Sequence, residues 1–188
     1  MLTPLITTDI LETERLKLRI ITPERYQTVF RSFNDQELAV YFGLTTPEAL
    51  EKEKERHRKG VTTFNKSFLN FLILDKGSKK VLGSCGYHTW YTEHARAEIG
   101  YALYDEAYKG QGIMKEAMPP IIRFGFEVMG LNRIEAFIGP ENEPSLRLVK
   151  RLGFTEEGRL RAHYYKNGRM EDSVVFSLLR DEFVWEEV

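Results

Sequence analysis

Residues 108–117 read YKGQGIMKEA and join a strand-like segment, residues 98–104, to an apolar-periodic helix expected to reach about Met129. Gly110 and Gly112 let the backbone turn tightly and leave its N–H groups uncovered, because glycine has no Cβ. The first N–H groups of a helix lack internal acceptors and lie at the positive end of its dipole. The pattern predicts an anion cradle for a phosphate or diphosphate, although a plain glycine-bearing connection has the same spacing.

Two widespread phosphate loops fit this stretch poorly. A Walker loop closes with Gly-Lys-Ser/Thr, whereas Gly112 is followed by Ile113 and Met114. A Rossmann fingerprint needs a third glycine at the position that Lys115 occupies.

Composition limits the class of protein. The chain has 188 residues, 42% of them hydrophobic, which is enough for one domain with a sizeable core. The formal net charge is −1, so the chain lacks the excess of basic residues that is typical of nucleic-acid-binding proteins. The single cysteine, Cys85, excludes an internal disulfide framework and is expected to be a small core residue rather than a reactive thiol.

The sequence also carries expectations about where the protein is found in the cell and whether it binds a metal. No apolar run reaches the roughly 18 residues of a membrane span, and no charged segment leads into an apolar stretch at the N-terminus. We expect a soluble, cytoplasmic protein without a membrane partner. The four histidines show no metal-ligand spacing, so no metal is expected.

The N-terminal half contains local signals for one strand and two helices. Residues 16–20 alternate at period two, as a strand does. Two Thr-Pro-Glu sequences read as an N-cap, an N1 proline and a first-turn acid, and they open helices over about 22–33 and 46–60. The mixed charges of residues 51–59 indicate a solvated helix face, or alternatively a substrate lid.

The remainder alternates strands with two further helices. The expected elements are a hairpin of residues 68–74 and 81–88, strands over 96–104 and 133–138, a helix over 144–152, and a hairpin of 154–165 and 169–179 turning at Asn167-Gly168. Pro119 and Pro120 lie inside the helix after the glycine cradle, so a kink or a loosened first turn is expected there. The order predicts a single α/β domain, a mixed, mostly antiparallel sheet with helices on both faces.

Several short segments now stand in a recognisable order. They are EIGY at 98–101, the cradle at 109–117, NEPS at 142–145, LGF at 152–154, Glu157-Gly158 and Asp172. Together they resemble the GNAT N-acetyltransferases, in particular the branch of the RimJ/RimL ribosomal-protein acetyltransferases. The resemblance covers residues 11–183 and implies one GNAT-fold N-acetyltransferase domain over residues 1–188.

The resemblance implies acetyl-CoA as donor. Its diphosphate would lie on the N–H groups of residues 111–114, and its pantetheine arm beside the strand 98–103, like an added strand. Lys109 stands where the family usually has Arg or Gln, and Met114 replaces a small residue. Arg147 and Lys150 could face the phosphates or only solvent. The cofactor-binding residues implied are Leu103, Tyr104, Lys109, Gly110, Gln111, Gly112, Ile113, Met114, Asn142 and Ser145.

Acyl transfer to an amine needs a neutral amine, a polarised thioester and a leaving thiolate that can be protonated. Glu98, on the strand beside the expected thioester, is the leading general base. The structural alternative is a carboxylate paired with Arg96 or another neighbour in the sheet. His88, near a strand end, is a weaker candidate base.

Three further residues have a chemical and a structural interpretation each. Asn142 matches the family's cofactor-binding asparagine, and it could equally be an Asx turn or N-cap. Ser145 matches a serine near the CoA sulfur that could protonate it, or it is simply a first-turn residue. Tyr164, next to His163, could protonate the thiolate or only pack on its strand, and Asp172 is expected to anchor the hairpin through backbone hydrogen bonds.

We therefore expect transfer of an acetyl group from acetyl-CoA to a primary amine by direct attack in a ternary complex. The first acceptor hypothesis is the α-amine of a protein N-terminus, on family likeness alone. The alternatives are a small amine (an amino acid, polyamine or antibiotic) and a non-catalytic acyl-CoA-binding module. The oligomeric state, monomer or homodimer, stays open.

Overall fold

The computed structural model describes residues 10–62, 66–166 and 168–184. Its strands are β1 (Ile10–Glu12), β2 (Leu16–Ile21), β3 (Ser67–Asp75), β4 (Val81–Tyr91), β5 (Arg96–Leu103), β6 (Arg133–Ile138), β7 (Thr155–Lys166) and β8 (Arg169–Leu179). Its α-helices are α1 (Pro23–Ser32), α2 (Asp35–Phe42), α3 (Pro47–Lys59), α4 (Ile113–Glu127) and α5 (Glu143–Arg151). Three single 3-10 turns complete these elements, η1 (Thr92–His94), η2 (Glu106–Tyr108) and η3 (Arg180–Glu182).

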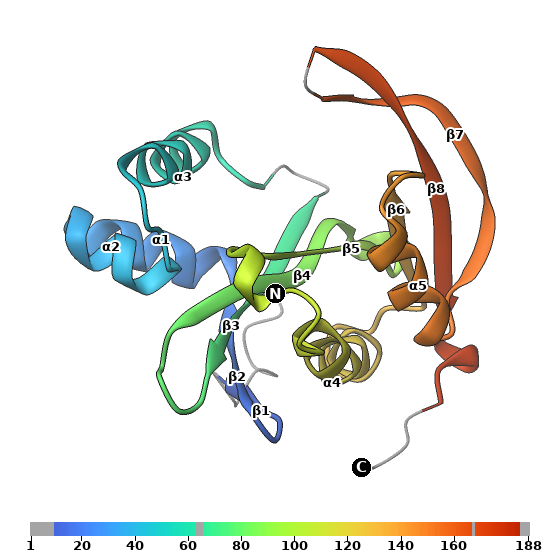
Figure 1. Cartoon of the computed structure of the whole chain (residues 1–188), viewed down its shortest axis with the longest axis horizontal. Coiled ribbons are helices and arrows are strands. Elements are labelled where there is room, and N and C mark those ends of the chain that lie inside the picture. The colour runs from blue at the N-terminus through green and yellow to red at the C-terminus, as the bar shows by residue number, and fades with distance from the viewer. Residues whose placement is uncertain (1–9, 63–65, 167, 185–188) are drawn as a thin grey trace.

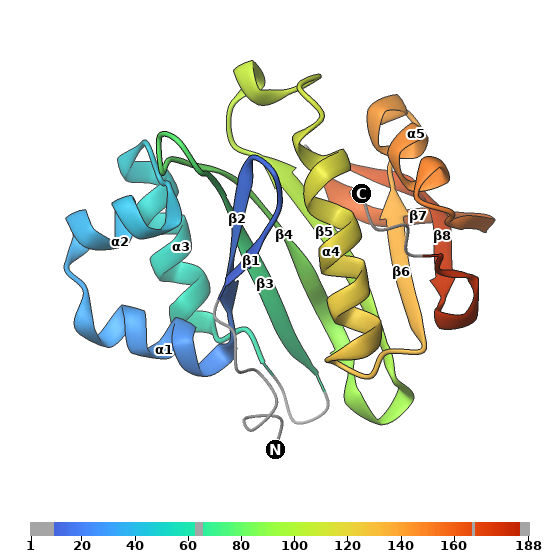
Figure 2. The same cartoon turned by 90° about the horizontal axis from the view of Figure 1, so that it is seen from below.

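One eight-stranded sheet organises the described part of the chain, in the order β1-β2-β3-β4-β5-β6-β8-β7. Neighbouring strands are antiparallel except for the parallel pair β5–β6. Helices α1 to α3 lie on one side of the sheet and α4 on the other (Figures 1 and 2). The predicted mixed, mostly antiparallel sheet with helices on both faces is confirmed.

Alternation along β3 explains why both faces of the sheet are covered. Phe71 and Ile73 point into a core that they share with α4, whereas Leu72 and Leu74 point into a second core beneath α1 and α2. Successive side chains of a strand alternate between its faces, so an almost wholly apolar strand requires helices on both. The sheet centre is thus fixed from two sides.

Helix starts follow the capping signals in the sequence. The hydroxyl of Thr22 accepts the N–H of Arg25 at the start of α1, and Thr46 accepts that of Ala49 at α3. Both helices agree with their predictions. Helix α2 was not predicted, although Asn34 and Glu37 form a reciprocal capping box at its start.

Helix α4 runs through Pro119 and Pro120 without interruption (Figure 2). It lies close to β4 at Gly125, where an added Cβ would stand 2.4 Å from the Tyr87 hydroxyl oxygen. That buried hydroxyl donates a 2.8 Å hydrogen bond to the carbonyl of Ile121. The glycine and the tyrosine together fix the distance between α4 and the sheet.

The parallel pair β5–β6 is short and ends in a fork. Arg96, Ala97 and Glu98 pair with residues 133–135, and there the pairing stops. Beyond that point β6 continues beside β8, while β5 continues beside β4. In the described part of the chain, the β6-facing edge of β5 has no strand partner from Ile99 to Leu103. The fork places Glu98 at its vertex.

Candidate active site

The cradle has the backbone that an anion site needs. Gly110 and Gly112 take φ values of 72° and 74°, and Gly112 is the N-cap of α4 with no side chain capping the helix. The side chains of Ile113 and Met114 are buried and anchor the helix start to the core. Among the described residues, no acceptor takes the N–H groups of residues 111–114. These donors are therefore available to a phosphate.

The residues next to the cradle are partly occupied by contacts within the protein, whereas the backbone N–H groups of the cradle are not. Lys109 forms an ion pair with Glu106, three residues earlier. The N–H of Tyr104 donates to the Leu82 carbonyl at 3.0 Å, so it extends the sheet, and Leu103 is half-buried. The unpaired edge between Ile99 and Leu103 matches the space that a pantetheine arm needs if it adds to β5 like a strand.

Glu98 is a buried carboxylate, 9% exposed, at the vertex of the fork. Burial raises its pKa to about 7, against smaller lowering effects of the Tyr164 hydroxyl and of His163. Tyr164 donates to Glu98 Oε1 at 3.3 Å, and His88 Nδ1 lies 3.5 Å from Oε2. Of the structural alternative, the pair with Arg96 is wrong, because Arg96 binds Glu135 at 2.7 Å. A neighbour in the sheet does lie beside Glu98, since His88 is opposite it in the β4–β5 register.

His88 is half-exposed and stands over Gly100, where an added Cβ would come within 2.8 Å of its Nε2 atom. Partial burial lowers the pKa of this imidazole, so it is mostly neutral at pH 7. A neutral histidine does not hold Glu98 in its ionised form as a cation would. Glu98 therefore keeps a pKa in the range of a general base.

Helix α5 brings two of the candidates to the fork. Asn142 is its N-cap, and its Oδ1 accepts the N–H of Ser145 at 3.3 Å. The structural interpretation of Asn142 is thus correct, and a cofactor role for its amide N–H₂ is compatible with it. Arg147 and Lys150 form ion pairs on the exposed face of α5, with carboxylates at 3.3 and 3.1 Å.

Tyr101 lines the candidate site, and the sequence analysis did not name it. Its hydroxyl is buried and has no hydrogen-bond partner among the described residues. Burial raises the pKa of this phenol, and the nearby Ser145 hydroxyl opposes the shift. Ser145 is thus the polar side chain beside this hydroxyl, and both residues line the same cavity. The available signal was its position on β5, beside the edge expected to hold pantetheine.

A bulge in β7 directs Tyr164 to Glu98. Between the pairs Leu160–Ser173 and Tyr164–Glu171, β7 advances four residues while β8 advances two. Ala162 takes a φ of 49° at this point, and its N–H donates to Asp172 Oδ1 at 2.8 Å. Asp172 thus anchors the hairpin through a backbone bond, as predicted. Asn167, in the predicted turn, lies outside the described residues.

A cavity of about 290 Å³ joins these groups. Its lining includes Glu98, Tyr101, Asn142, Ser145, Tyr164 and Asp172. Three of these, Glu98, Ser145 and Tyr164, are the predicted catalytic residues, and they come from three separate elements. The fork, the start of α5 and the β7 bulge therefore converge on one space.

Other features of the described residues lie outside this cavity. Cys85 is buried, and burial raises the pKa of its thiol. None of the described helices is both long and apolar enough to cross a membrane. In residues 10–62, 66–166 and 168–184, no three His, Cys, Asp or Glu side chains are grouped as metal ligands would be.

Comparison with known proteins identifies the family. The sequence model described as "Acetyltransferase (GNAT) domain" matches residues 15–155. The chain belongs to the GNAT family. The GNAT protein YoaA of Bacillus subtilis, an uncharacterized N-acetyltransferase, is 34% identical over 172 residues, which are 91% of this chain and 97% of YoaA.

Two other GNAT relatives have named substrates. The crystal structure of ribosomal-protein-S5-alanine acetyltransferase from Vibrio fischeri has a TM-score of 0.65 and 27% identity, and the match covers 93% of this chain and 98% of that one. Spermidine N(1)-acetyltransferase of Escherichia coli is 27% identical over 93 residues, half of each chain. Family and relatives together make this GNAT protein an acetyl-CoA-dependent N-acetyltransferase.

Proposed function

We propose that this GNAT enzyme acetylates the α-amine of a protein N-terminus, with Glu98 as the general base. The observation that carries the proposal is a single carboxylate, buried at the fork, whose pKa of about 7 lets it exchange a proton at neutral pH. In this proposal the amine and the thioester meet in the cavity lined by Glu98, Ser145 and Tyr164.

Backbone groups are proposed to hold the donor. The N–H groups of residues 111–114 would bind the diphosphate, and the unpaired edge of β5 would bind the pantetheine arm. When bound, acetyl-CoA supplies the acetyl group as a thioester. The buried hydroxyl of Tyr101 and the amide of Asn142 line the cavity and are proposed to bind polar atoms of the arm.

Glu98 is proposed to remove the proton that makes the amine unreactive. An alkyl ammonium has its pKa near 8–10, so a base at the site raises the fraction of neutral amine, typically for a 10²–10⁴-fold gain in rate. Desolvation makes Glu98 a stronger base than an exposed carboxylate, and with a pKa of about 7 a substantial fraction of it is ionised at neutral pH. The hydrogen bond from Tyr164 keeps Oε1 oriented toward the cavity.

Ser145 is the proposed proton donor to the leaving thiolate. It takes a proton back through water from the protonated Glu98, so that the proton removed from the amine ends on the thiol of CoA. It stands in the first turn of α5 and lines the cavity beside Tyr101. A free thiol has a pKa of about 8.5, so the thiolate needs little help to leave. Tyr164 was a second candidate for this step. Since its hydroxyl already donates to Glu98, its proposed part is to orient the base.

The choice of acceptor rests on the charges at the cavity. Besides Glu98, it is lined by Glu171 and Asp172, which already form ion pairs with Arg169 at 3.2 Å and Arg159 at 2.8 Å. A polyamine needs a second uncompensated carboxylate for its distal ammonium, whereas a protein N-terminus presents one amine. The likeness to the ribosomal-protein acetyltransferase over nearly the whole chain supports the same choice.

Spermidine is the second candidate acceptor, because three carboxylates line the cavity and a spermidine acetyltransferase is among the relatives. The two proposals are tested with one panel: acetyl-CoA, peptides with free or blocked N-termini, and spermidine. We expect turnover of free N-termini with acetylation of the α-amine, read by mass. Acetylated spermidine as the sole product would refute the first acceptor and support the second.

A further inference from the structure

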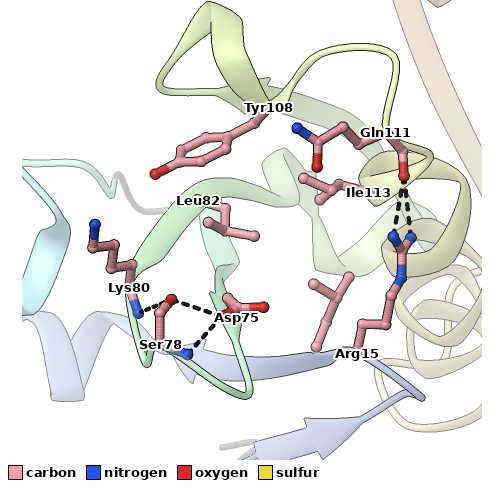
Figure 3. Close-up of a pocket in the computed structure, with 9 residues that line it drawn as sticks. Arg15, Asp75, Ser78, Lys80, Leu82, Tyr108, Gln111 and Ile113 are labelled. Carbon is pink, nitrogen blue, oxygen red and sulfur yellow. Dashed lines mark hydrogen bonds between the residues drawn. The ribbon is translucent and has the colours of Figure 1, made fainter.

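The cradle is tied to the β1–β2 turn by an arginine that the proposed mechanism does not use. Arg15 Nη1 and Nη2 both lie 3.2 Å from the carbonyl oxygen of Gln111, and Figure 3 shows the side chain reaching across to it. The Nε atom of the same guanidinium donates to Glu116 Oε2 at 2.6 Å. One planar group thus joins the loop before α4 to the first turns of the helix.

Glu116 is itself held from two further sides. Its Oε1 accepts the backbone N–H of Arg15 at 2.8 Å and the hydroxyl of Thr13 at 2.5 Å. Burial would raise the pKa of Glu116, but these hydrogen bonds from Thr13 and Arg15 hold it below its ordinary value. The carboxylate is ionised at neutral pH, and the guanidinium is kept in one orientation by charge and by its fork geometry.

The orientation of one peptide group follows from these contacts. In a trans peptide the carbonyl oxygen and the following N–H point in opposite directions. Arg15 draws the Gln111 oxygen toward the β1–β2 turn, so the N–H of Gly112 points away from that turn. The φ of 74° at Gly112 is one that glycine adopts readily, so the backbone can take this orientation without strain.

We propose that Arg15 is a positioning residue of the donor site, which fixes the Gln111–Gly112 peptide so that its N–H is presented to the diphosphate of CoA. Arg15 acts through the backbone and not through its charge. This inference rests on the proposed placement of the diphosphate on the cradle. It adds that the Gln111–Gly112 peptide must be held in one orientation, which neither the glycines nor the helix start ensures alone.

Charge and orientation predict opposite results for one variant. Glu116→Gln removes a negative charge near the diphosphate, so Coulomb forces alone would tighten CoA binding. The same change takes away the ionised acceptor that orients Arg15, so the positioning role predicts weaker binding. Arg15→Lys makes a second distinction, since lysine keeps the charge and lacks the planar fork.

The test compares donors with and without the nucleotide portion. We would measure the Kd of CoA by calorimetry, and kcat/KM with acetyl-CoA and with S-acetylpantetheine, for Arg15→Ala, Arg15→Lys and Glu116→Gln. Lys17→Ala is the matched control, because it removes a cation two residues from Arg15, on β2, that pairs only with the exposed Glu12 among the described residues. Circular dichroism melting reports the fold of each variant.

We expect all three variants to bind CoA about tenfold more weakly, the effect of one lost oriented donor to a charged group. Turnover of S-acetylpantetheine, which lacks the diphosphate, should stay within twofold of wild type, and Lys17→Ala should resemble wild type with both donors. Restored binding in Arg15→Lys, or tighter binding in Glu116→Gln, would overturn the positioning role and leave charge as the cause.

Two other outcomes separate this inference from the proposed function. Equal losses with both donors would assign Arg15 to general stability and refute its role at the cradle. If wild type favours CoA over pantetheine and Arg15→Ala keeps that preference, only the role of Arg15 is refuted. If wild type shows no preference, the diphosphate does not use the cradle, and the proposed placement of the donor fails together with the role of Arg15, whereas the roles of Glu98 and of the acceptor are tested separately.

Discussion

Replacing Glu98 by glutamine should reduce activity and increase stability, and the second effect can be calculated from the structure. The carboxyl has a pKa of about 7 in the folded protein against an ordinary 4.5, a difference that corresponds to about 3 kcal/mol. Because the folded pKa is raised, the stability it contributes is complete below pH 4.5 and is lost as pH rises through 7. Glutamine carries no such penalty and can still accept from Tyr164.

We therefore expect Glu98→Gln to match the wild type in unfolding free energy at about pH 4 and to exceed it by about 3 kcal/mol at pH 8. In a domain of this size, that difference raises Tm by about 6–12 °C. In the same variant, kcat/KM for a primary amine should fall by about 10²–10⁴-fold, and the rise in rate through pH 7 should disappear. Urea denaturation at both pH values and a pH–rate profile measure these effects.

Glu135 provides the matched control, since it faces Glu98 in the register of the β5–β6 pair. It binds Arg96 at 2.7 Å and Arg133 at 2.8 Å, so Glu135→Gln should lower stability at pH 8. A Glu98→Gln enzyme that keeps both its activity and its pH dependence would exclude Glu98 as the base. Unchanged stability of that variant at pH 8 would contradict the desolvation argument.

Four further variants test the rest of the site. Gly112→Asp should weaken CoA binding by more than tenfold, because a carboxylate at the cradle repels the diphosphate and a Cβ strains the backbone at a φ of 74°; unchanged calorimetric affinity would show that the cradle is assigned wrongly. Ser145→Ala should lower kcat about tenfold while CoA binding is retained, and equal kcat would exclude it as proton donor. Tyr164→Phe removes a hydrogen bond that lowers the pKa of Glu98, so the rise in rate should move to higher pH; an unmoved profile would disprove that contact in solution. Asp172→Ala should destabilise the protein by about 1–2 kcal/mol, as judged by urea denaturation, because the N–H of Ala162 loses its acceptor.

Local signals predicted most of the fold. The Thr-Pro-Glu starts of α1 and α3, the hairpins and the glycine turn before α4 all depend on neighbouring residues, which the sequence displays directly. Helix α2 was missed although its capping box was visible, since only eight residues separate that signal from the glycine that ends the helix. Strand β1, with three residues, is too short to show a period.

The site was predictable only in part, for a different reason. Glu98 and Tyr164 were named separately, but their contact spans 66 positions and depends on a bulge whose extra residues no local pattern indicates. The bond between Arg15 and Glu116 spans 101 positions and gave no signal at all. Contacts of this kind are set by the sheet order, which the sequence does not display.

The fork between β5 and β6 has a consequence for how such an enzyme can diversify. In the proposed function, main-chain groups bind the donor. Most side-chain substitutions in these segments would leave donor binding unchanged, since nearly every residue carries the same amide. The β7–β8 hairpin, which extends beyond α5 (Figure 1), presents side chains instead, and these are free to change. Substitutions in the β7–β8 hairpin could then change which amine is accepted, while the backbone of β5 and of the cradle continues to bind the same donor.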